Sequence, residues 1–167
     1  MSDAGARPFA EPVVLQGLAD CRAMLHLIRT ELPPALADLT DQALFDHFTA
    51  SYEPGSDVVK AVYDADHTPI GFYRYAPWPR DAVQSATVHL FDIAVDPQLR
   101  RRGVGSALIG DLIADCRRDR YRWIVSRTDR RNTVAIEFHK RHRFAIEFTT
   151  EDAIVWRKAV ATDRSDR

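Results

Sequence analysis

A predicted strand that ends at Val95 runs into a turn rich in arginine and glycine, and this turn opens a helix. The strand ends there because Pro97 cannot continue a central β-ladder. The turn is Arg100–Ser106, and it contains Gly103 and Gly105. At the start of a helix, backbone N–H groups lack intrahelical acceptors and lie at the positive end of the helix dipole. This arrangement therefore predicts an anion site.

Three kinds of anion site share this order of strand, turn and helix. A Walker phosphate loop requires Gly-Lys-Ser/Thr, and it is excluded because the turn contains no lysine. A dinucleotide-binding turn has its glycines close behind the strand, whereas Gly103 lies eight positions after Val95 and Leu108 occupies the place of the third glycine. The remaining pattern is Arg/Gln-x-x-Gly-x-Gly/Ala, which the hexapeptide 100–105 satisfies as Arg-Arg-Arg-Gly-Val-Gly.

The hydrophobic pattern changes along the chain between the two-residue period of strands and the 3.6-residue period of helices. It predicts strands over 12–15, 58–63, 70–75, 87–95, 121–126, 144–148 and 153–156. It predicts helices over 18–32, from Thr40 as N-cap to before Glu53, over 103–117 and over 132–142. This order indicates an α+β fold with a mixed, mostly antiparallel central sheet, flanked by about four helices. Parallel strands are expected only where a helix crosses over, between Val95 and Ser126.

The length of 167 residues, 46% of them hydrophobic and 28% charged, fits one ordinary domain with a full-sized core. We expect this domain to cover 11–158, with loose tails at 1–10 and 159–167. No apolar run approaches the ~20 residues that span a bilayer, and the chain lacks the basic start and apolar stretch of a secretory signal. These patterns predict a cytoplasmic protein without a membrane partner.

The net charge is only −1, but the charges are unevenly distributed. From Arg100 to Arg143 there are 13 Lys+Arg against 5 Asp+Glu, which leaves 10 against 19 in the rest of the chain. Such a surplus attracts anions, although any single arginine is also suited to a solvated surface. The segment predicts a phosphate-bearing partner. Nucleic acid is not expected as that partner, because the aromatic residues near the arginines, Tyr121 and Trp123, belong to a predicted strand.

The hexapeptide 100–105 resembles the phosphate-binding turn of the GNAT acetyltransferase superfamily. The preceding strand ends in Ile93-Ala94-Val95-Asp96-Pro97, and the later residues are Asn132-x-x-Ala135-x-x-Phe138-His139-x-x-x-x-Phe144. These motifs and the crossing helix between them are similar to the family in order and spacing, over roughly Val88 to Phe144. The resemblance implies a single GNAT-like domain in which the two central strands splay apart, and an acetyl-CoA-dependent N-acetyltransferase.

The resemblance also implies how the cosubstrate acetyl-CoA is held. Backbone N–H groups of the turn would bind the coenzyme pyrophosphate. The pantetheine arm would lie between the splayed strands and pair with the first of them. The Ile93 N–H would then stabilise the oxyanion that forms as an amine attacks the thioester. The implied coenzyme-binding residues are Ile93, Ala94, Val95, Arg100, Arg101, Arg102, Gly103, Val104, Gly105, Ser106 and Asn132.

Residues of the second motif have implied roles as well. Asn132 occupies the position of an asparagine that bonds the pantetheine, and it is equally suited to cap the helix that follows. His139 stands where many members carry a tyrosine that protonates the leaving thiolate, and a neutral imidazole could donate a hydrogen bond to that thiolate. Arg143 stands where the family usually has glycine, so we expect the turn before Phe144 to differ.

A base near the thioester must take the proton that the acceptor amine loses. His89 lies where protein-acetylating members carry a glutamate base, and Asp92 lies where polyamine-type members carry an acid. Strand alternation puts these two side chains on opposite faces unless a bulge lies between them. Structural interpretations stay open for both, because His89 could be a hydrogen-bonded residue of a half-buried strand and Asp92 a partner of a helix N-terminus.

The remaining polar and aromatic residues carry less chemistry. No metal site is expected, because the other histidines lack ligand spacing and both cysteines lie on apolar stripes of predicted helices; these residues are His26, His47, His67, His142, Cys21 and Cys116. The region that walls the acceptor pocket in the family contains Asp41, Asp46, His47, Tyr52 and Glu53, which are also suited to a solvated helix face. Trp78, between two prolines, is interpreted as a lid or a dimer contact.

Our first hypothesis is an enzyme that transfers an acetyl group from acetyl-CoA to a primary amine of a small molecule, by direct attack in a ternary complex. A second is acetylation of a protein lysine or N-terminus, which the absence of the glutamate base disfavours for histone-type substrates. A third is a non-catalytic module that senses coenzyme A or binds nucleic acid. Because members of the family often dimerise, a homodimer is a further expectation.

Overall fold

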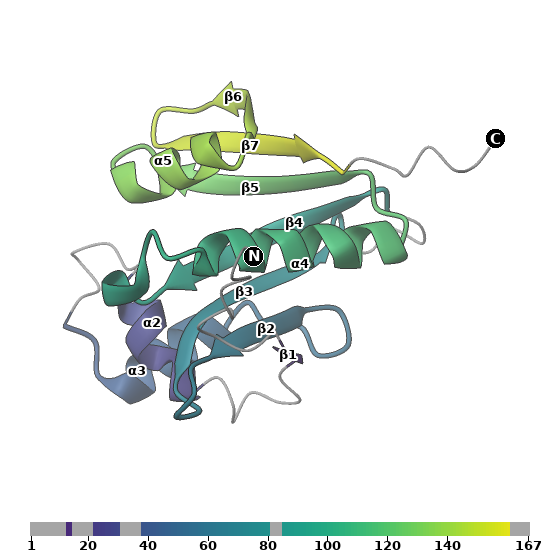
Figure 1. Cartoon of the computed structure of the whole chain (residues 1–167). Helices are drawn as coiled ribbons and strands as arrows, with labels where there is room; N and C mark the ends of the chain where they lie inside the picture. Colours follow the sequence, from purple (N-terminus) through teal and green to yellow (C-terminus); the bar gives the residue numbers. More distant parts are fainter. Residues whose placement is uncertain (1–12, 15–21, 31–37, 81–84, 161–167) are drawn as a thin grey trace, which may run out of the picture. The chain divides into compact units, whose positions relative to one another are not determined.

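The computed structural model of the chain describes residues 13–14, 22–30, 38–80 and 85–160. The predicted N-terminal tail 1–10 lies outside this part. Seven strands are hydrogen-bonded in the order β1-β2-β3-β4-β5-β7-β6 (Figure 1). They are β1 Val13–Val14, β2 Val58–Tyr63, β3 Pro69–Pro77, β4 Thr87–Val95, β5 Trp123–Asp129, β6 Ala145–Thr149 and β7 Ala153–Ala159. The described helices are η1 Arg22–Met24, α2 Leu25–Thr30, α3 Asp41–Thr49, η3 Pro97–Leu99, α4 Val104–Arg118 and α5 Thr133–Arg141.

The described residues form two compact units, and the elements β3, β4 and α4 each contribute to both. The first unit consists of the described residues up to Glu53 together with Val58–Tyr73 and Ile93–Leu108. The second unit consists of Pro54–Asp57, Arg74–Asp92 and the described residues from Ile109 onward. The fold is therefore α+β with a mixed sheet, as the sequence predicts.

The first unit has a core formed by one helical layer and one face of the strands. Met24, Leu27, Leu44 and Phe48 of the helices pack with side chains from β2, β3 and β4, namely Val59, Ala61, Phe72 and Ala94. The rings of Phe48 and Phe72 meet edge to face with centroids 5.9 Å apart. The helices α2 and α3 thus cover the strand face that holds Phe72 (Figure 1).

Local side chains determine where α3 begins and how β2 turns into β3. Thr40 has extended backbone angles, and its hydroxyl accepts the Ala43 N–H at 3.2 Å, which confirms the predicted N-cap. The helix ends at Thr49, earlier than the predicted limit at Glu53. At the hairpin, the Asp64 carboxylate accepts two backbone N–H groups, from Asp66 at 3.0 Å and from Thr68 at 2.8 Å.

Strands β4 and β5 run parallel, and α4 connects them, which confirms the predicted crossover. Their ladder pairs Thr87 with Trp123 and ends with Leu90 opposite Ser126. From there β5 continues along β7 as far as the pair Asp129 and Ala153. Phe91 and Asp92 of β4 lie beyond the end of the ladder with β5. Strands β4 and β5 are therefore hydrogen-bonded to each other at one end only. This is the splay of the two central strands that the resemblance to the GNAT family implies.

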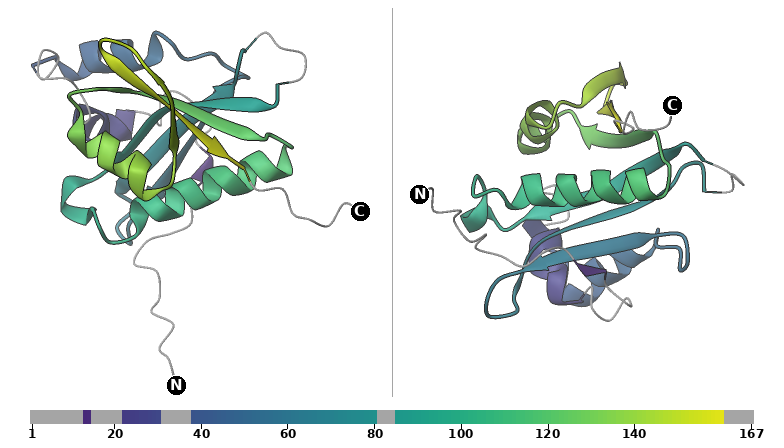
Figure 2. Two further views of the ribbon diagram at one scale, coloured as in Figure 1. Left: turned by 90° about the horizontal axis from the view of Figure 1, so that it is seen from above. Right: turned by 45° about the vertical axis from the view of Figure 1, so that its right-hand side comes forward.

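The helix α5 lies along β5 and β7 in the second unit (Figure 2). Trp156 of β7 is 1% exposed, and its ring stacks on the ring of His139 of α5 at a centroid distance of 5.1 Å. The indole N–H of Trp156 donates to the Thr128 hydroxyl at 3.1 Å. The rings of Phe144 and His139 meet edge to face, with centroids 4.9 Å apart. These contacts fix α5 on the sheet by aromatic packing with a satisfied polar group.

Strand β4 carries one residue more than the stretch of β3 opposite it. The Asp96 N–H donates to the Ile70 carbonyl at 2.9 Å, and the Trp78 N–H donates to the Thr87 carbonyl at 2.9 Å. Ile70 and Trp78 are eight positions apart, whereas Thr87 and Asp96 are nine apart. An antiparallel pair keeps a constant register unless one strand contains an extra residue, which is a β-bulge.

The side chains locate this bulge at Phe91 and Asp92. Although these residues are consecutive, both contact Arg74 of β3: its Cζ lies 5.3 Å from the Phe91 ring centroid, and its Nε lies 2.6 Å from Asp92 Oδ2. His89 is on the same side, because its ring centroid is 4.3 Å from that of Phe91. Regular alternation would place His89 and Asp92 on opposite faces of β4. The bulge instead places both side chains on the same face, which is the alternative that the sequence left open.

The structure corrects three details near the C-terminal end. The strands β5 and β7 continue to Asp129 and Ala159, beyond the predicted ends at Ser126 and Trp156. Val160 is buried and its N–H donates to the Arg122 carbonyl at 2.9 Å, so the first two residues of the predicted tail belong to the fold. The turn before Phe144 keeps the conformation that suits glycine, since Arg143 has a φ of 59°, and the expectation of a different turn is wrong.

We expect Gly71→Ala to destabilise the protein. A Cβ at Gly71 would lie 3.0 Å from Val104 Cγ1, 3.1 Å from Leu108 Cδ1 and 3.2 Å from the Ala94 carbonyl oxygen. Because overpacking costs about 1–3 kcal/mol, the free energy of unfolding in urea should fall by that amount. Gly110→Ala is the matched control, since a Cβ there has nothing within 4 Å and alanine favours the helix. Equal stability of the two variants would contradict the close packing at Gly71.

Candidate active site

The turn after β4 is built by a capped 3-10 helix and two left-handed residues. The Asp96 carboxylate accepts the Gln98 N–H at 2.8 Å and so caps η3. The Arg102 N–H donates to the Leu99 carbonyl at 3.4 Å. Arg101 and Gly103 then adopt φ angles of 64° and 91°, which turn the chain into α4. The left-handed conformation explains why a glycine occupies position 103.

The start of α4 offers backbone donors to a ligand. The first N–H of this helix with a recorded acceptor is that of Ala107, which donates to the Gly103 carbonyl at 2.9 Å. The preceding N–H groups belong to the first turn, which has no intrahelical acceptors. Gly103 and Ser106 are exposed, and a Cβ at Gly103 would meet nothing within 4 Å. A phosphate can therefore approach the backbone here.

Positive charge surrounds the same turn. Arg101 and Arg102 are exposed, and Arg100 is held back because its Nε donates to the Val95 carbonyl at 3.2 Å. Some other arginines between Arg100 and Arg143 are paired with carboxylates. Arg127, for example, contacts Asp152 at 2.7 Å. The first unit thus contains the predicted residues 93–95 and 100–106 in one segment with positive charge and unpaired helix-start donors. This geometry fits the pyrophosphate of a coenzyme.

His89 of β4 lies in an aromatic and cationic environment in the second unit. Its ring is 5.2 Å from Trp78 and 4.3 Å from Phe91 between centroids. Its Nδ1 is buried without a hydrogen-bond partner in the described part of the chain. Burial, together with the positive charges of Arg80 and Arg74, lowers the pKa of His89 to about 4. The imidazole is therefore neutral at pH 7 and has a lone pair available.

Asp92 belongs to a chain of ion pairs. Arg74 donates from Nε to Asp92 Oδ2 at 2.6 Å, and its Nη1 lies 3.8 Å from Asp57 Oδ2. Arg80 Nη2 contacts both oxygens of Asp57, at 2.8 and 3.0 Å. The side chains of Asp57 and Arg74 are 0% and 5% exposed, whereas that of Asp92 is 33% exposed. Asp92 therefore has an arginine partner in the described part of the chain.

Sequence reasoning missed most of this ion-pair chain. Arg74 is flanked by Tyr73 and Tyr75 in a strand whose residues are almost all buried, and a lone arginine in such a strand signals a buried partner. The sequence contained that signal but not the identity of the partner. Asp57 lies in the loop before β2, and Arg80 lies beyond the end of β3, so neither spacing indicates the contact.

The two predicted residues of the second motif lie on α5. Asn132 is the N-cap, because its Oδ1 accepts the Ala135 N–H at 3.0 Å; this confirms the capping interpretation, and contact with pantetheine stays a prediction. His139 is 2% exposed, and its Nδ1 lies 2.7 Å from the Ala135 carbonyl. An imidazole nitrogen at this distance from a carbonyl oxygen carries the proton, so the neutral ring has an acceptor at Nε2. In this form His139 has no proton at Nε2 to give to a thiolate.

The stability of the protein should fall as the pH drops from about 6.5 towards about 4. Burial is the main cause that lowers the pKa values of His89, His139 and His142 in the folded protein. The unfolded chain therefore binds more protons than the folded protein in this range, which weakens folding in acid. Urea unfolding at about pH 7.5 and about pH 5 would measure the difference. A free energy of unfolding that is equal or higher at the lower pH would contradict these shifts.

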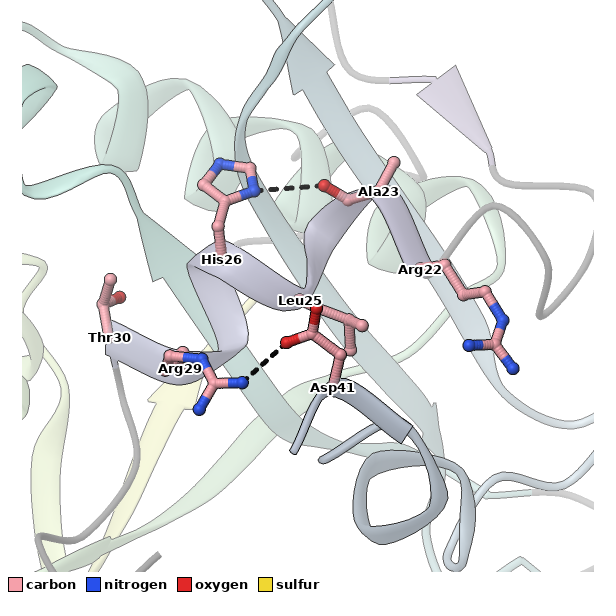
Figure 3. Close-up of a pocket in the computed structure, with 7 residues that line it drawn as sticks. All are labelled: Arg22, Ala23, Leu25, His26, Arg29, Thr30 and Asp41. Carbon is pink, nitrogen blue, oxygen red and sulfur yellow. Dashed lines mark hydrogen bonds and ion pairs between the residues drawn. The ribbon is translucent and has the colours of Figure 1, made fainter. Parts of the chain in front are cut away.

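A separate pocket of about 450 Å³ lies in the first unit, beside η1, α2 and the start of α3 (Figure 3). Asp41, one of the residues expected in an acceptor-pocket wall, lines it and pairs with Arg29 at 2.7 Å. Arg29 also donates to the Leu39 carbonyl at 2.8 Å. His26 Nδ1 lies 3.1 Å from the Ala23 carbonyl. The charges of Arg29 and Asp41 neutralise each other, so this ion pair adds no net charge to the pocket.

Within the described residues, no three His, Cys, Asp or Glu side chains form a group that could hold a metal ion. Cys116 is buried and free, and burial with nearby Asp115 raises the pKa of its thiol to about 12. Cys21 lies outside the described residues. No helix in the described part of the chain is both long and apolar enough to cross a membrane.

The fold and the turn after β4 together define an acyl-coenzyme A-binding transferase, and comparison with known proteins agrees. The profile of the acetyltransferase (GNAT) family matches residues 21–144, which is most of the chain. The chain belongs to the GNAT family. It is an acetyltransferase that uses acetyl-CoA, as its family does. A search of curated sequences finds no significant match.

Several solved structures have the same fold. A GNAT-family protein from Desulfovibrio desulfuricans is 21% identical with a TM-score of 0.73, over 92% of this chain and 99% of that chain. PaiA N-acetyltransferase from Thermoplasma acidophilum, in complex with coenzyme A, is 13% identical with a TM-score of 0.67, over 90% and 99%. The ribosomal-protein-S18-alanine N-acetyltransferase from Escherichia coli is 18% identical with a TM-score of 0.66, over 93% and 97%.

Proposed function

We propose that the protein transfers the acetyl group of acetyl-CoA to a primary amine of a small molecule, by direct attack in a ternary complex. In this proposal the N–H groups of Arg101 to Ser106 bind the pyrophosphate of acetyl-CoA, and Asn132 contacts the pantetheine arm. The Ile93 N–H donates to the thioester carbonyl oxygen. The first turn of α4, whose N–H groups lack intrahelical acceptors, and the incomplete ladder between β4 and β5 support these assignments.

The acceptor arrives as an ammonium ion at pH 7, so two protons leave its nitrogen, one before the attack and one as the amide forms, and one proton reaches the sulfur. The amine nitrogen attacks the thioester carbon, and the carbonyl oxygen becomes an oxyanion that the Ile93 N–H stabilises. The carbon–sulfur bond then breaks, the amide forms, and the thiolate of coenzyme A is protonated. The proton of the attacking nitrogen passes to a base, directly or through water.

The observation that carries the choice of the proton-accepting group is the environment of His89. Its imidazole is neutral at pH 7, its Nδ1 has no hydrogen-bond partner among the described residues, and it lies four positions before Ile93 in the same strand. Asp92 is engaged by Arg74, so we assign His89 as the group that accepts a hydrogen bond from the amine or a bridging water; because its lowered pKa makes it a weak base, the proton passes on to solvent. The proton for the thiolate comes from the ammonium proton or solvent in this scheme, because the buried His139 already donates its Nδ1 proton to Ala135.

A small acceptor is supported by the side chains that crowd the strand face beside His89. Trp78, Arg80 and Phe91 all lie near it, which leaves less open strand surface for an extended peptide. Acetylation of a lysine or N-terminus in a protein is the competing outcome. A cytoplasmic location, which rests on the sequence patterns given above, and a homodimer, which rests on the frequent dimerisation of the family, are part of the proposal.

The test is a panel of amines and peptides scored by release of the coenzyme A thiol, preceded by titration calorimetry with acetyl-CoA. Lack of acetyl-CoA binding at high micromolar ligand would overturn the proposal. His89→Ala should lower kcat with little change in acetyl-CoA affinity. Asp92→Ala should change kcat mainly because Arg74 loses the carboxylate of Asp92. His139→Phe should retain activity if His139 donates no proton. Faster acetylation of peptides than of any small amine would favour the competing outcome.

A further inference from the structure

The rings of Trp78, His89 and Phe91 lie together beside one face of β4. Trp78 follows β3, and its ring is 5.2 Å from His89 and 6.4 Å from Phe91 between centroids. His89 and Phe91 meet edge to face at 4.3 Å. Trp78 is 46% exposed, so part of its indole surface is accessible to a ligand. We call Trp78, His89 and Phe91 the ring cluster; the coenzyme site proposed above includes none of these rings.

The charges beside the ring cluster are matched in pairs. Arg80 and Arg74 lie with their Cζ atoms 4.8 and 5.3 Å from the Phe91 ring centroid. Arg80 is paired with Asp57 at 2.8 Å, and Arg74 is paired with Asp92 at 2.6 Å. Two positive and two negative side chains therefore cancel on this face. A polycationic acceptor would find little electrostatic attraction there.

A flat apolar group gains more from the same surface. Aromatic rings prefer tilted or edge-to-face contact with other rings, and an exposed indole offers such a surface without ordering a long side chain. The cluster also lies close in the chain to the reacting strand segment, because Phe91 is two positions before Ile93 and His89 is four before it. A ring held on Trp78 would keep its attached amine near the imidazole of His89.

We propose that the acceptor is a primary amine joined by a short aliphatic linker to an aromatic ring, and that Trp78 binds this ring while the amine lies beside His89. The inference rests on the proposed function, since it names the acceptor class of the same site. Trp78 is then a specificity-determining residue, and it takes no part in moving protons.

The test compares three amines on the full chain: 2-phenylethylamine, 2-cyclohexylethylamine, which has a similar size but no planar ring, and spermidine, which is polycationic. We expect the wild-type protein to give the highest kcat/KM with 2-phenylethylamine. Trp78→Leu should raise the KM for this amine about tenfold with a similar kcat, and Trp78→Phe should restore most of the loss. Phe148→Leu is the control, because Phe148 is a 54% exposed ring on β6.

The outcomes separate this inference from the proposed function. An unchanged acetyl-CoA affinity shows that the Trp78 variants are folded. Acetylation of spermidine in preference to 2-phenylethylamine would overturn the ring inference alone, as would equal kcat/KM for the phenyl and cyclohexyl amines or a Trp78→Leu variant with the wild-type KM. Absence of thiol release with all three amines, with acetyl-CoA bound and peptides acetylated, would overturn the proposed function and this inference with it.

Discussion

Gly103→Asp is expected to abolish acetyl-CoA binding, with an increase in Kd of more than about a hundredfold. Gly103 has a φ of 91°, and it precedes the first turn of α4, whose N–H groups have no intrahelical acceptors. A carboxylate at this position would compete for these donors and repel the pyrophosphate of the coenzyme. Titration calorimetry with acetyl-CoA measures the effect directly.

Gly103→Asn separates charge from backbone strain. Asparagine has nearly the same shape as aspartate and, like it, tolerates positive φ better than most residues, but it carries no charge. We therefore expect a smaller increase in Kd for Gly103→Asn than for Gly103→Asp. Because a Cβ at this position meets no protein atom within 4 Å, neither variant should unfold the protein. Wild-type affinity in a folded Gly103→Asp variant would show that the coenzyme phosphates bind elsewhere.

Asp57→Ala is expected to lower the free energy of unfolding by about 3–5 kcal/mol, the usual effect of removing one member of a buried ion pair. The Asp57 carboxylate is fully buried, and its oxygens lie 2.8 and 3.0 Å from Arg80 and 3.8 Å from Arg74. Without it, the guanidinium groups of Arg74 and Arg80 lose the carboxylate that both of them contact. Equilibrium unfolding in urea at neutral pH measures the change.

The matched control is Asp129→Ala, which removes a carboxylate that is also close to an arginine. Its contact with Arg131 is 2.8 Å long, and these neighbouring donors lower the pKa of Asp129 to about 2. Both side chains are open to solvent, so water and salt screen the pair and its removal should change the stability little. If Asp57→Ala were as mild as Asp129→Ala, the ion-pair chain around Arg74 would have no structural role.

The sequence predicted the elements whose limits depend on neighbouring residues. The range of β4 is as predicted because Pro97 ends the ladder, and α3 begins where Thr40 can cap it. The capping role of Asn132 follows from the same local chemistry. The turn of Arg101 to Gly103 was predicted from glycine spacing, which reports backbone conformation directly. Local signals of this kind need no knowledge of the rest of the fold.

Features that depend on distant residues were not predictable in the same way. The partners of Arg74 lie at Asp57 and Asp92, and only folding brings them together. The bulge in β4 has no glycine or proline to indicate it. The sequence therefore left open whether His89 and Asp92 lie on the same face of the strand. At Arg143 the expectation failed for another reason, since a non-glycine residue adopts a φ of 59° when the surrounding turn requires it.

The extra residue of β4 makes this strand sensitive to changes in length. Deleting one residue between Leu90 and Ile93 would restore regular alternation, and the side chains on one side of the deletion would then point to the opposite face. Ala94 would leave the core that it shares with Phe72, or His89 and Phe91 would turn away from Trp78. Substitutions along β4 are therefore expected to disturb this protein less than the insertion or deletion of a residue there.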